Sequence, residues 1–307
     1  MSLHLVTLTS SQALGIPIAL VGSAFLALGA QLQHRGVNKV DAETPPEKKA
    51  GLNIRQLISL ARRPSWLLGT LMLTLAIVCQ LWSLAIAPLT VVQPLGVLGL
   101  VITALVNSRV SHKPLDAASI RAIVLCVFGV GTFVTIAAIT TSSVAIGDAQ
   151  LIVVLIILAV VLTTAALVFA FFRKRFTTIF YIVGAGILFG FVATLAKVDI
   201  DRIETIITAD RGLHVGDILT IICLLGLILA GLLGSYFVQT AYSSGPPDLV
   251  VAGLTVIDPI VGVTIGITVL GEAAGAPFWA AIVFVLAGII AIYGVFLLSK
   301  HHPQIRR

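Results

Sequence analysis

The sequence is poor in charge. Charged side chains make up only 10% of the 307 residues, whereas hydrophobic side chains make up 58%. A chain of this length with so few charges cannot cover a water-soluble globule with polar surface. Long polar segments are replaced by apolar runs, each long enough to cross a hydrocarbon core about 30 Å thick. We therefore expect a membrane protein whose main partner is the lipid bilayer.

Cysteine is also scarce, and the short motifs of common enzyme classes are missing. The three cysteines, Cys79, Cys126 and Cys223, lie within apolar runs and have no CxxC spacing, which indicates packing roles and no metal or redox site. The sequence has no GxxxxGK phosphate-binding loop, no HExxH zinc motif and no nucleophile elbow. We therefore expect no cofactor, no direct use of ATP and no enzymatic activity.

The apolar runs divide the chain into nine predicted membrane spans. They are Gln12–His34, Ser65–Ala87, Pro88–Ser108, Ala117–Ala138, Gln150–Phe172, Thr177–Asp199, Gly216–Tyr242, Pro246–Leu270 and Pro277–Leu298. Each is near the roughly 20 residues that a membrane-spanning helix needs. The pattern predicts an all-α polytopic membrane protein, with residues 1–307 forming a single membrane domain.

Lysine and arginine fall mainly in alternate loops. They gather in the predicted cytoplasmic loop 36–64, in the third and fifth loops and in the C-terminal tail, whereas the opposite loops hold only Arg202 and Arg211. By the positive-inside rule we expect a cell (plasma) membrane protein with its N-terminus outside and its C-terminus in the cytoplasm. The net charge of +6 is therefore a topology signal, and we expect no nucleic-acid partner.

A faint internal repeat divides the spans into two groups of four. The first half covers 12–138, a linking helix covers 150–172, and the second half covers 177–298. Gly22, Phe25 and Gln33 recur at the same spacings as Gly186, Phe189 and Lys197. Because five spans precede the second half, that half is inverted in the membrane. Inverted halves are the arrangement that many transporters use for alternating access.

One hairpin carries a family resemblance. The stretch APLTVVQPLGVLGLVITALVNS (Ala87–Ser108), followed by a small-residue helix with Gly129 and Gly131, resembles the paired helices of the drug/metabolite transporter superfamily. Within it the chain is most similar to the NIPA-like magnesium transporter branch and its bacterial relatives, which share nine spans and an Ala-Pro…Pro-Leu-Gly hairpin. The resemblance implies a transporter. An acidic residue usual after this hairpin is replaced by His112–Lys113, so the substrate class stays open.

Asp258 is the polar residue that most needs an explanation. It lies 12 positions after Pro246, about 18 Å along a helix, and hence near mid-membrane. A carboxylate there costs about 2.5–3.5 kcal/mol to insert, so we expect it to face the protein interior or a watery cavity. Thr255, Gly262 and Gly266 share its helical face. We predict that Asp258 and Thr255 belong to a substrate or coupling-ion site, with Asp258 as the ligand if a divalent cation is carried.

A structural role for Asp258 is the alternative. Asp followed by Pro is typical of a helix start, so Asp258 would cap the second part of a helix that breaks at Pro259. Gln93 and Pro94 are the neutral counterparts in the first half, where we predict another helix break and a further site residue. The two roles are compatible, because helices broken at mid-membrane often form binding sites from their exposed ends.

Four other polar residues complete the candidates. Gln80 and Gln239 lie near the ends of corresponding helices in the two halves and offer amides to the predicted site. Lys197 ends its predicted span near the outer surface, where we expect it to reach the interface unless it turns inward towards Asp258. Glu272 is expected as an exposed loop carboxylate at the outer mouth.

Glycines recur on two of the predicted helices. Gly15, Gly22 and Gly29 are seven residues apart, and Gly186 and Gly190 form a small-xxx-small pair. Both patterns indicate close helix packing.

These observations favour a secondary transporter of a small metabolite or drug-like solute, coupled to protons or cations through Asp258. A magnesium or divalent-cation transporter is the first alternative, although Mg²⁺ is usually bound by one or two carboxylates and a single mid-membrane acid is the minimum. A flippase for a lipid-linked phosphate, with Lys197 as phosphate partner, is the second. A non-transporting membrane subunit is the third. Two fused halves predict a complete monomer, with a homodimer as the alternative.

Overall fold

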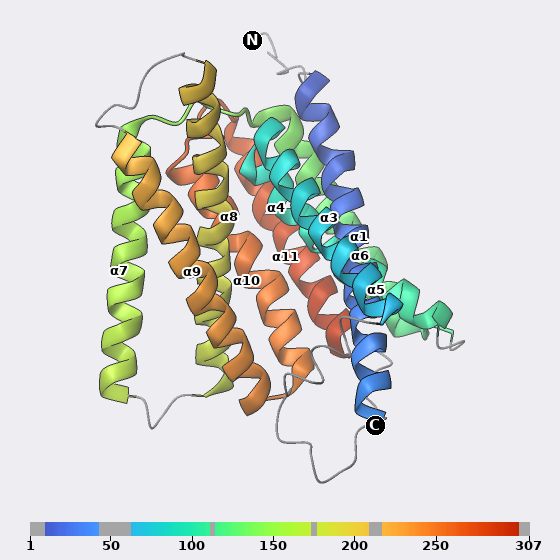
Figure 1. Cartoon of the computed structure of the whole chain (residues 1–307). Helices are drawn as coiled ribbons and strands as arrows, with labels where there is room; N and C mark the ends of the chain where they lie inside the picture. The colour runs from blue at the N-terminus through green and yellow to red at the C-terminus, as the bar shows by residue number, and fades with distance from the viewer. Residues whose placement is uncertain (1–9, 43–62, 111–113, 173–176, 209–216, 301–307) are drawn as a thin grey trace.

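The computed structural model describes residues 10–42, 63–110, 114–172, 177–208 and 217–300. All regular secondary structure within these ranges is helical, and the helices form one bundle (Figure 1). The helices are α1 (Ser10–Ala42), α3 (Pro64–Ile86), α4 (Leu89–Gly96), α5 (Leu98–Val110), α6 (Ala117–Thr140), α7 (Asp148–Phe172), α8 (Thr178–Thr208), α9 (Asp217–Ser244), α10 (Pro247–Thr268) and α11 (Phe278–Lys300). The protein is an all-α polytopic membrane protein. With α4 and α5 taken as one span, nine spans of membrane-crossing length and hydropathy lie in the described ranges, as the sequence predicts.

Two helices are longer than the apolar runs that predict them. Helix α1 continues to Ala42, and α8 continues from Asp199 to Thr208, about two and a half further turns. The added part of α8 has no Gly or Pro to end it, and Lys197 pairs with Asp201 one turn later, which supports a helix. The predicted loop 36–64 therefore begins inside α1, and residues 43–62 lie outside the described residues.

The two prolines predicted to break helices behave differently. Helix α4 ends at Gly96 and α5 starts at Leu98. At this break the Val97 N–H donates to the Pro94 carbonyl three residues back, which is the spacing of a tight 3₁₀ turn. Pro259 lies inside α10 without interrupting it, so the predicted break there is wrong. Neighbouring helices often hold a proline-containing membrane helix together, and α8 packs against this part of α10.

The helices pack as two equivalent halves would. Helix α1 packs along α3, and α8 packs along α9 in the same way; α4 contacts α10, and α6 contacts α11. Helix α1 starts at the end of the bundle where α8 finishes (Figure 1). The corresponding first helices therefore run in opposite directions. Helix α7 connects the halves and lies at the edge of the bundle beside α9.

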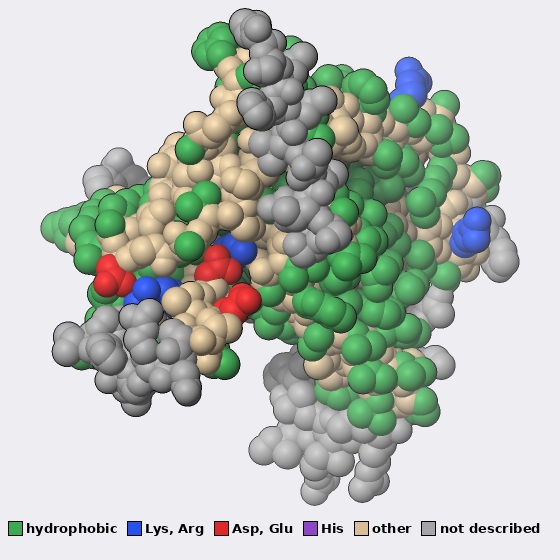
Figure 2. Space-filling view, turned by 90° about the horizontal axis from the view of Figure 1, so that it is seen from above, with side chains coloured by type: hydrophobic (Ala, Val, Ile, Leu, Met, Phe, Trp, Pro, Cys, Tyr) green, Lys and Arg blue, Asp and Glu red, His purple; other side chains and the backbone are tan. Residues whose placement is uncertain are grey.

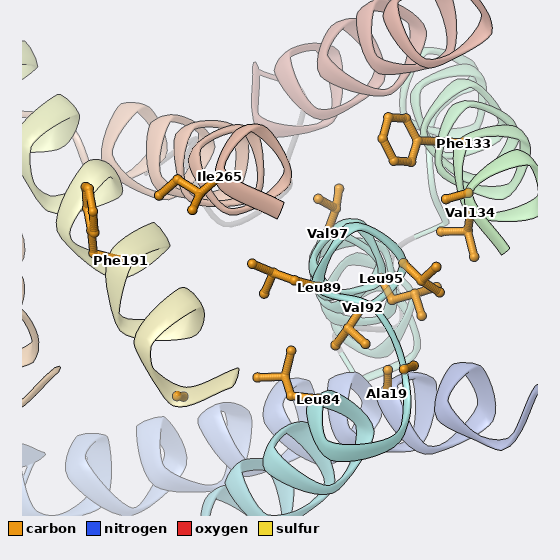
Figure 3. Packing of buried hydrophobic residues seen from close by; sticks show 14 of the residues in the cluster. Ala19, Leu84, Leu89, Val92, Leu95, Val97, Phe133, Val134, Phe191 and Ile265 are labelled. Carbon is orange, nitrogen blue, oxygen red and sulfur yellow. The ribbon is translucent and has the colours of Figure 1, made fainter. Parts of the chain in front are cut away.

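The short helix α4 lies at the centre of the packing. All of its residues except Gly96 are buried. Figure 3 shows apolar side chains of several helices arranged around it, including Ala19 of α1, Leu84 of α3 and Phe133 of α6. Helix α4 thus packs against helices of both halves, including α1, α6 and α10.

The glycine patterns have the predicted packing role. A Cβ added at Gly15 would lie 2.5 Å from the Cβ of Ala87, and one at Gly22 would lie 3.0 Å from the Cβ of Cys79. On α8, a Cβ at Gly190 would lie 2.6 Å from the Cβ of Val261. Contacts this short leave no room for a methyl group. The glycines therefore set how closely α1 approaches α3 and α8 approaches α10.

We expect Gly190→Ala to lower the free energy of unfolding by about 1–3 kcal/mol, because the new methyl group overfills the α8–α10 contact. Gly131→Ala is the matched control: no heavy atom would lie within 4 Å of its Cβ. The control should be neutral or gain about 0.4–1 kcal/mol from the smaller freedom of its unfolded chain. Thermal unfolding of the purified protein in detergent measures both, and equal melting temperatures would contradict the packing argument.

Candidate functional site

A cavity of about 460 Å³ lies between the two halves. Helices α1, α3 and α4 of the first half line it together with α8 and α10 of the second. Its polar lining residues are Ser23, Gln80, Gln93, Thr255 and Asp258. Most of the remaining lining is apolar, with Phe189 of α8 as its aromatic member. The α3 wall reaches the bundle surface, since Ile77 is 61% exposed.

Four of the predicted site residues meet in this cavity, namely Asp258, Gln93, Gln80 and Thr255. Asp258 is the ionisable residue among the described lining residues. Its Oδ1 atom is buried and has no hydrogen-bond partner in the described part of the chain, and the same holds for Nε2 of Gln93. A buried acceptor and a buried donor without partners are costly. The cavity therefore offers both to a ligand.

The surroundings of these two side chains fix their positions. Gly262 lies one turn after Asp258, and a Cβ there would come within 3.0 Å of the Gln93 Cγ atom. The glycine thus lets Gln93 pack directly against α10. Thr255 donates its hydroxyl to the Val251 carbonyl at 2.8 Å, so only its oxygen lone pairs are available to a ligand.

The capping role considered for Asp258 does not fit the structure. Helix α10 runs unbroken from Pro247 to Thr268, so Asp258 is an interior residue with no helix start to cap. Pro94 and Pro259 both line a second, apolar cavity of about 90 Å³ that α6 and α11 also border, and Pro259 lines the first cavity as well.

Gln239 and Lys197 lie outside the cavity lining. Gln239 is on an exposed face of α9. Lys197 was expected to reach the membrane interface, and this prediction is wrong: the residue is 2% exposed, and its Nζ lies 3.1 Å from Oδ1 of Asp201. Because α8 continues beyond it, Lys197 lies within the bundle and not at a helix end. Its i,i+4 spacing from Asp201 is the sequence signal for this pair.

Glu272 is buried, which also corrects the sequence prediction of an exposed loop carboxylate. It is 3% exposed. Its Oε1 accepts the N–H of Leu89 at 2.6 Å, and its Oε2 accepts the N–H of Thr90 at 2.8 Å and the Thr90 hydroxyl at 2.5 Å. These N–H groups begin α4, where Pro88 provides no side-chain cap. Glu272 therefore caps a helix of the other half of the chain.

The environment of Glu272 affects its ionisation in both directions. Burial raises the pKa of Glu272 above its ordinary value. Hydrogen bonds from Thr90 and Leu89 and the positive charge of Lys197 oppose this rise. The carboxylate form is thus the one that its neighbours recognise.

A charged cluster near this end of the bundle was not predicted. Viewed from the end where α1 starts, acidic side chains lie beside basic ones (Figure 2). Arg202 lies 2.9 Å from Asp148 at the start of α7. Asp199 is 4% exposed, and neither of its carboxylate oxygens has a hydrogen-bond partner in the described part of the chain. Within the described ranges, no group of three His, Cys, Asp or Glu side chains is placed to hold a metal ion.

We expect Asp258→Asn to leave the melting temperature unchanged or to raise it, because the substitution removes a buried charge and keeps the shape of the side chain. Loss of a helix cap would instead cost about 0.5–2 kcal/mol. Thermal unfolding of the ligand-free protein distinguishes the two. A clear fall in the melting temperature would restore a structural role for Asp258.

Comparison with known proteins finds a similar protein that matches nearly the whole chain. The chain is 26% identical over 294 residues to an uncharacterized protein of Corynebacterium glutamicum, an alignment that covers 94% of this chain and 96% of that protein. No family model matches the chain. No solved structure matches it.

Proposed function

We propose that the protein is a secondary transporter of a small metabolite or drug-like solute, and that its two halves give alternating access to the cavity between them. The observation that carries this proposal is the position of Asp258, an acid near mid-membrane in a cavity lined by both halves. Intramembrane acids that face a cavity commonly serve as ion or proton sites. Inverted halves around a midplane site are a recurring transporter design.

The cavity's size and lining support a small organic solute. Its volume of about 460 Å³ lies within the roughly 300–1,000 Å³ of small-molecule sites, which are mostly apolar with a few polar groups. Asp258 favours a solute or coupling ion with a positive charge or a hydrogen-bond donor. Gln93 and Gln80 can orient the solute through amide hydrogen bonds.

The two alternative cargoes are less well supported. Mg²⁺ is usually held by one or two carboxylates together with phosphates and waters, and Asp258 is the carboxylate among the described lining residues. A lipid-linked phosphate needs a cation, but Lys197 is paired with Asp201 outside the cavity lining. We therefore rank magnesium transport second and phosphate flipping third.

The proposal extends to the family and the setting of the protein. The resemblance of the Ala87–Ser108 hairpin supports membership in the drug/metabolite transporter superfamily. The loop charges support a plasma-membrane location with the N-terminus outside and the C-terminus in the cytoplasm. The protein is proposed to act without enzymatic chemistry, as a monomer or a homodimer.

A ligand screen by thermal unfolding tests the function. Purified protein is heated with Mg²⁺ and other divalent cations, amines, amino acids, nucleosides or polyprenyl phosphates at several pH values. A ligand present at 100 times its dissociation constant stabilises the folded state by about 2.7 kcal/mol. We expect an organic compound to stabilise the wild type and to lose this effect in Asp258→Asn.

Gln239→Ala is the matched control, because it removes an amide outside the cavity and should keep the full response. The stabilising compound is then tested for uptake into proteoliposomes with and without a proton gradient. A response to a divalent cation alone would replace the organic solute with magnesium. Stabilisation that is equal in Asp258→Asn and the wild type would contradict a site at Asp258.

A further inference from the structure

Buried residues border one end of the cavity, and the direction of this end can be traced along four helices. Ala196 lines the cavity, and the next residue, Lys197, does not. Gln93 lines it, whereas Thr90 lies one turn earlier in α4. On α10, Gly266 lies about 12 Å beyond Asp258. Leu84, near the end of α3, lines the same side.

A set of polar contacts fills the space just beyond the cavity at this end. Glu272 accepts hydrogen bonds from the Leu89 and Thr90 N–H groups and from the Thr90 hydroxyl. Lys197 and Asp201 form their ion pair nearby, and the charge of Lys197 acts on Glu272. We call these five residues the Glu272 network. It joins α4 of the first half to the α10–α11 loop and α8 of the second half.

Helix α10 lies close to the Glu272 network at Gly266. A Cβ at Gly266 would lie 2.9 Å from both Oε2 of Glu272 and Oγ1 of Thr90. On the neighbouring pair of helices, Ser83 donates its hydroxyl to the Gly15 carbonyl at 2.8 Å. The start of α1 and the end of α3 are therefore joined beside the start of α4, and α4 meets the second half through Glu272. Opening this end requires α4 to separate from Glu272.

We propose that Glu272 is a gating residue, whose hydrogen bonds to the start of α4 hold this end of the cavity closed and must break when the cavity opens there. This inference rests on the proposed transport function. If Glu272 capped a helix of its own half, the two would move together and the hydrogen bonds would not have to break. The Glu272 contacts instead join the two halves that alternating access moves relative to each other.

Site-directed labelling tests the gate without a known solute. Cys79, Cys126 and Cys223 are replaced by serine or alanine, and Ala193→Cys places one thiol in the cavity lining. A membrane-impermeant maleimide is applied to vesicles from one side at a time, and an N-terminal tag reports the side on which α1 starts. We expect slow labelling from that side in the parent protein.

Glu272→Gln keeps the size of the side chain but weakens the hydrogen bonds that the carboxylate accepts. Loss of one charge-assisted hydrogen bond shifts a two-state equilibrium by about tenfold, so we expect labelling from the α1-start side to rise about tenfold. Glu204→Gln is the matched control: it neutralises an exposed carboxylate of α8 near the same end and should leave the labelling rate unchanged.

Thr90→Val is the second variant. It removes only the hydroxyl that donates to Glu272, and we expect a rise of about tenfold, because this one bond to the carboxylate is charge-assisted. If Glu272→Gln does not yield folded protein, the Thr90→Val rate decides the matter. Unchanged labelling in the folded variants would overturn the gate and leave Glu272 as a helix cap.

The labelling result and the transport result can be told apart. Faster labelling in Glu272→Gln, with no solute bound or moved by the wild type, would support an opening end and remove the proposed function. Unchanged labelling with Asp258-dependent ligand binding would remove the gate alone.

Discussion

In a hydrocarbon core, every backbone N–H and C=O group must find its partner within the protein, and this constraint governs the architecture. It restricts the spans to helices and requires any irregular backbone to be covered by other parts of the chain. The break between α4 and α5 meets this requirement, because the Val97 N–H donates to the Pro94 carbonyl and Gly96 lines the cavity. The start of α4 meets it through Glu272, which accepts the N–H groups of Leu89 and Thr90. A central broken helix and a buried loop carboxylate are thus two consequences of the same constraint.

Close glycine contacts and the central cavity are also linked. Gly15 and Gly22 bring α1 against α3, while Gly186 and Gly190 bring α8 against α10. Each pair is packed so closely that a single added methyl group would overlap a neighbour. The cavity lies between the pairs, and Gly262 makes a close contact between the halves there, since a Cβ at Gly262 would lie 3.0 Å from the Gln93 Cγ atom. On the proposed function, motion between the two pairs changes the access to this cavity.

The sequence predicts the features that depend on local composition and misses those that depend on distant neighbours. The nine spans, the close packing of the glycines and the inward position of Asp258 follow from hydropathy, residue size and the cost of burying a charge. The position of Glu272 does not, because its partners at Leu89 and Thr90 are more than 180 residues away in the chain. The predicted helix break at Pro259 is wrong because the packing of α8 on α10, and not the proline itself, decides whether α10 continues.

The chemical difference between the halves bears on which conformation the protein prefers. A molecule with two identical inverted halves would have the same energy whether it opened to one side or to the other. Here the loop after α10 carries Glu272, which accepts N–H groups of α4 in the other half. The acid of the corresponding loop after α5 is Asp116, which accepts the Ser119 N–H and caps α6 within its own half. The Glu272 hydrogen bonds therefore join the two halves at one end, whereas the Asp116 cap lies within one half. On the proposed mechanism this favours the state in which the Glu272 end is closed, and a transported solute or ion must supply the free energy that opens it.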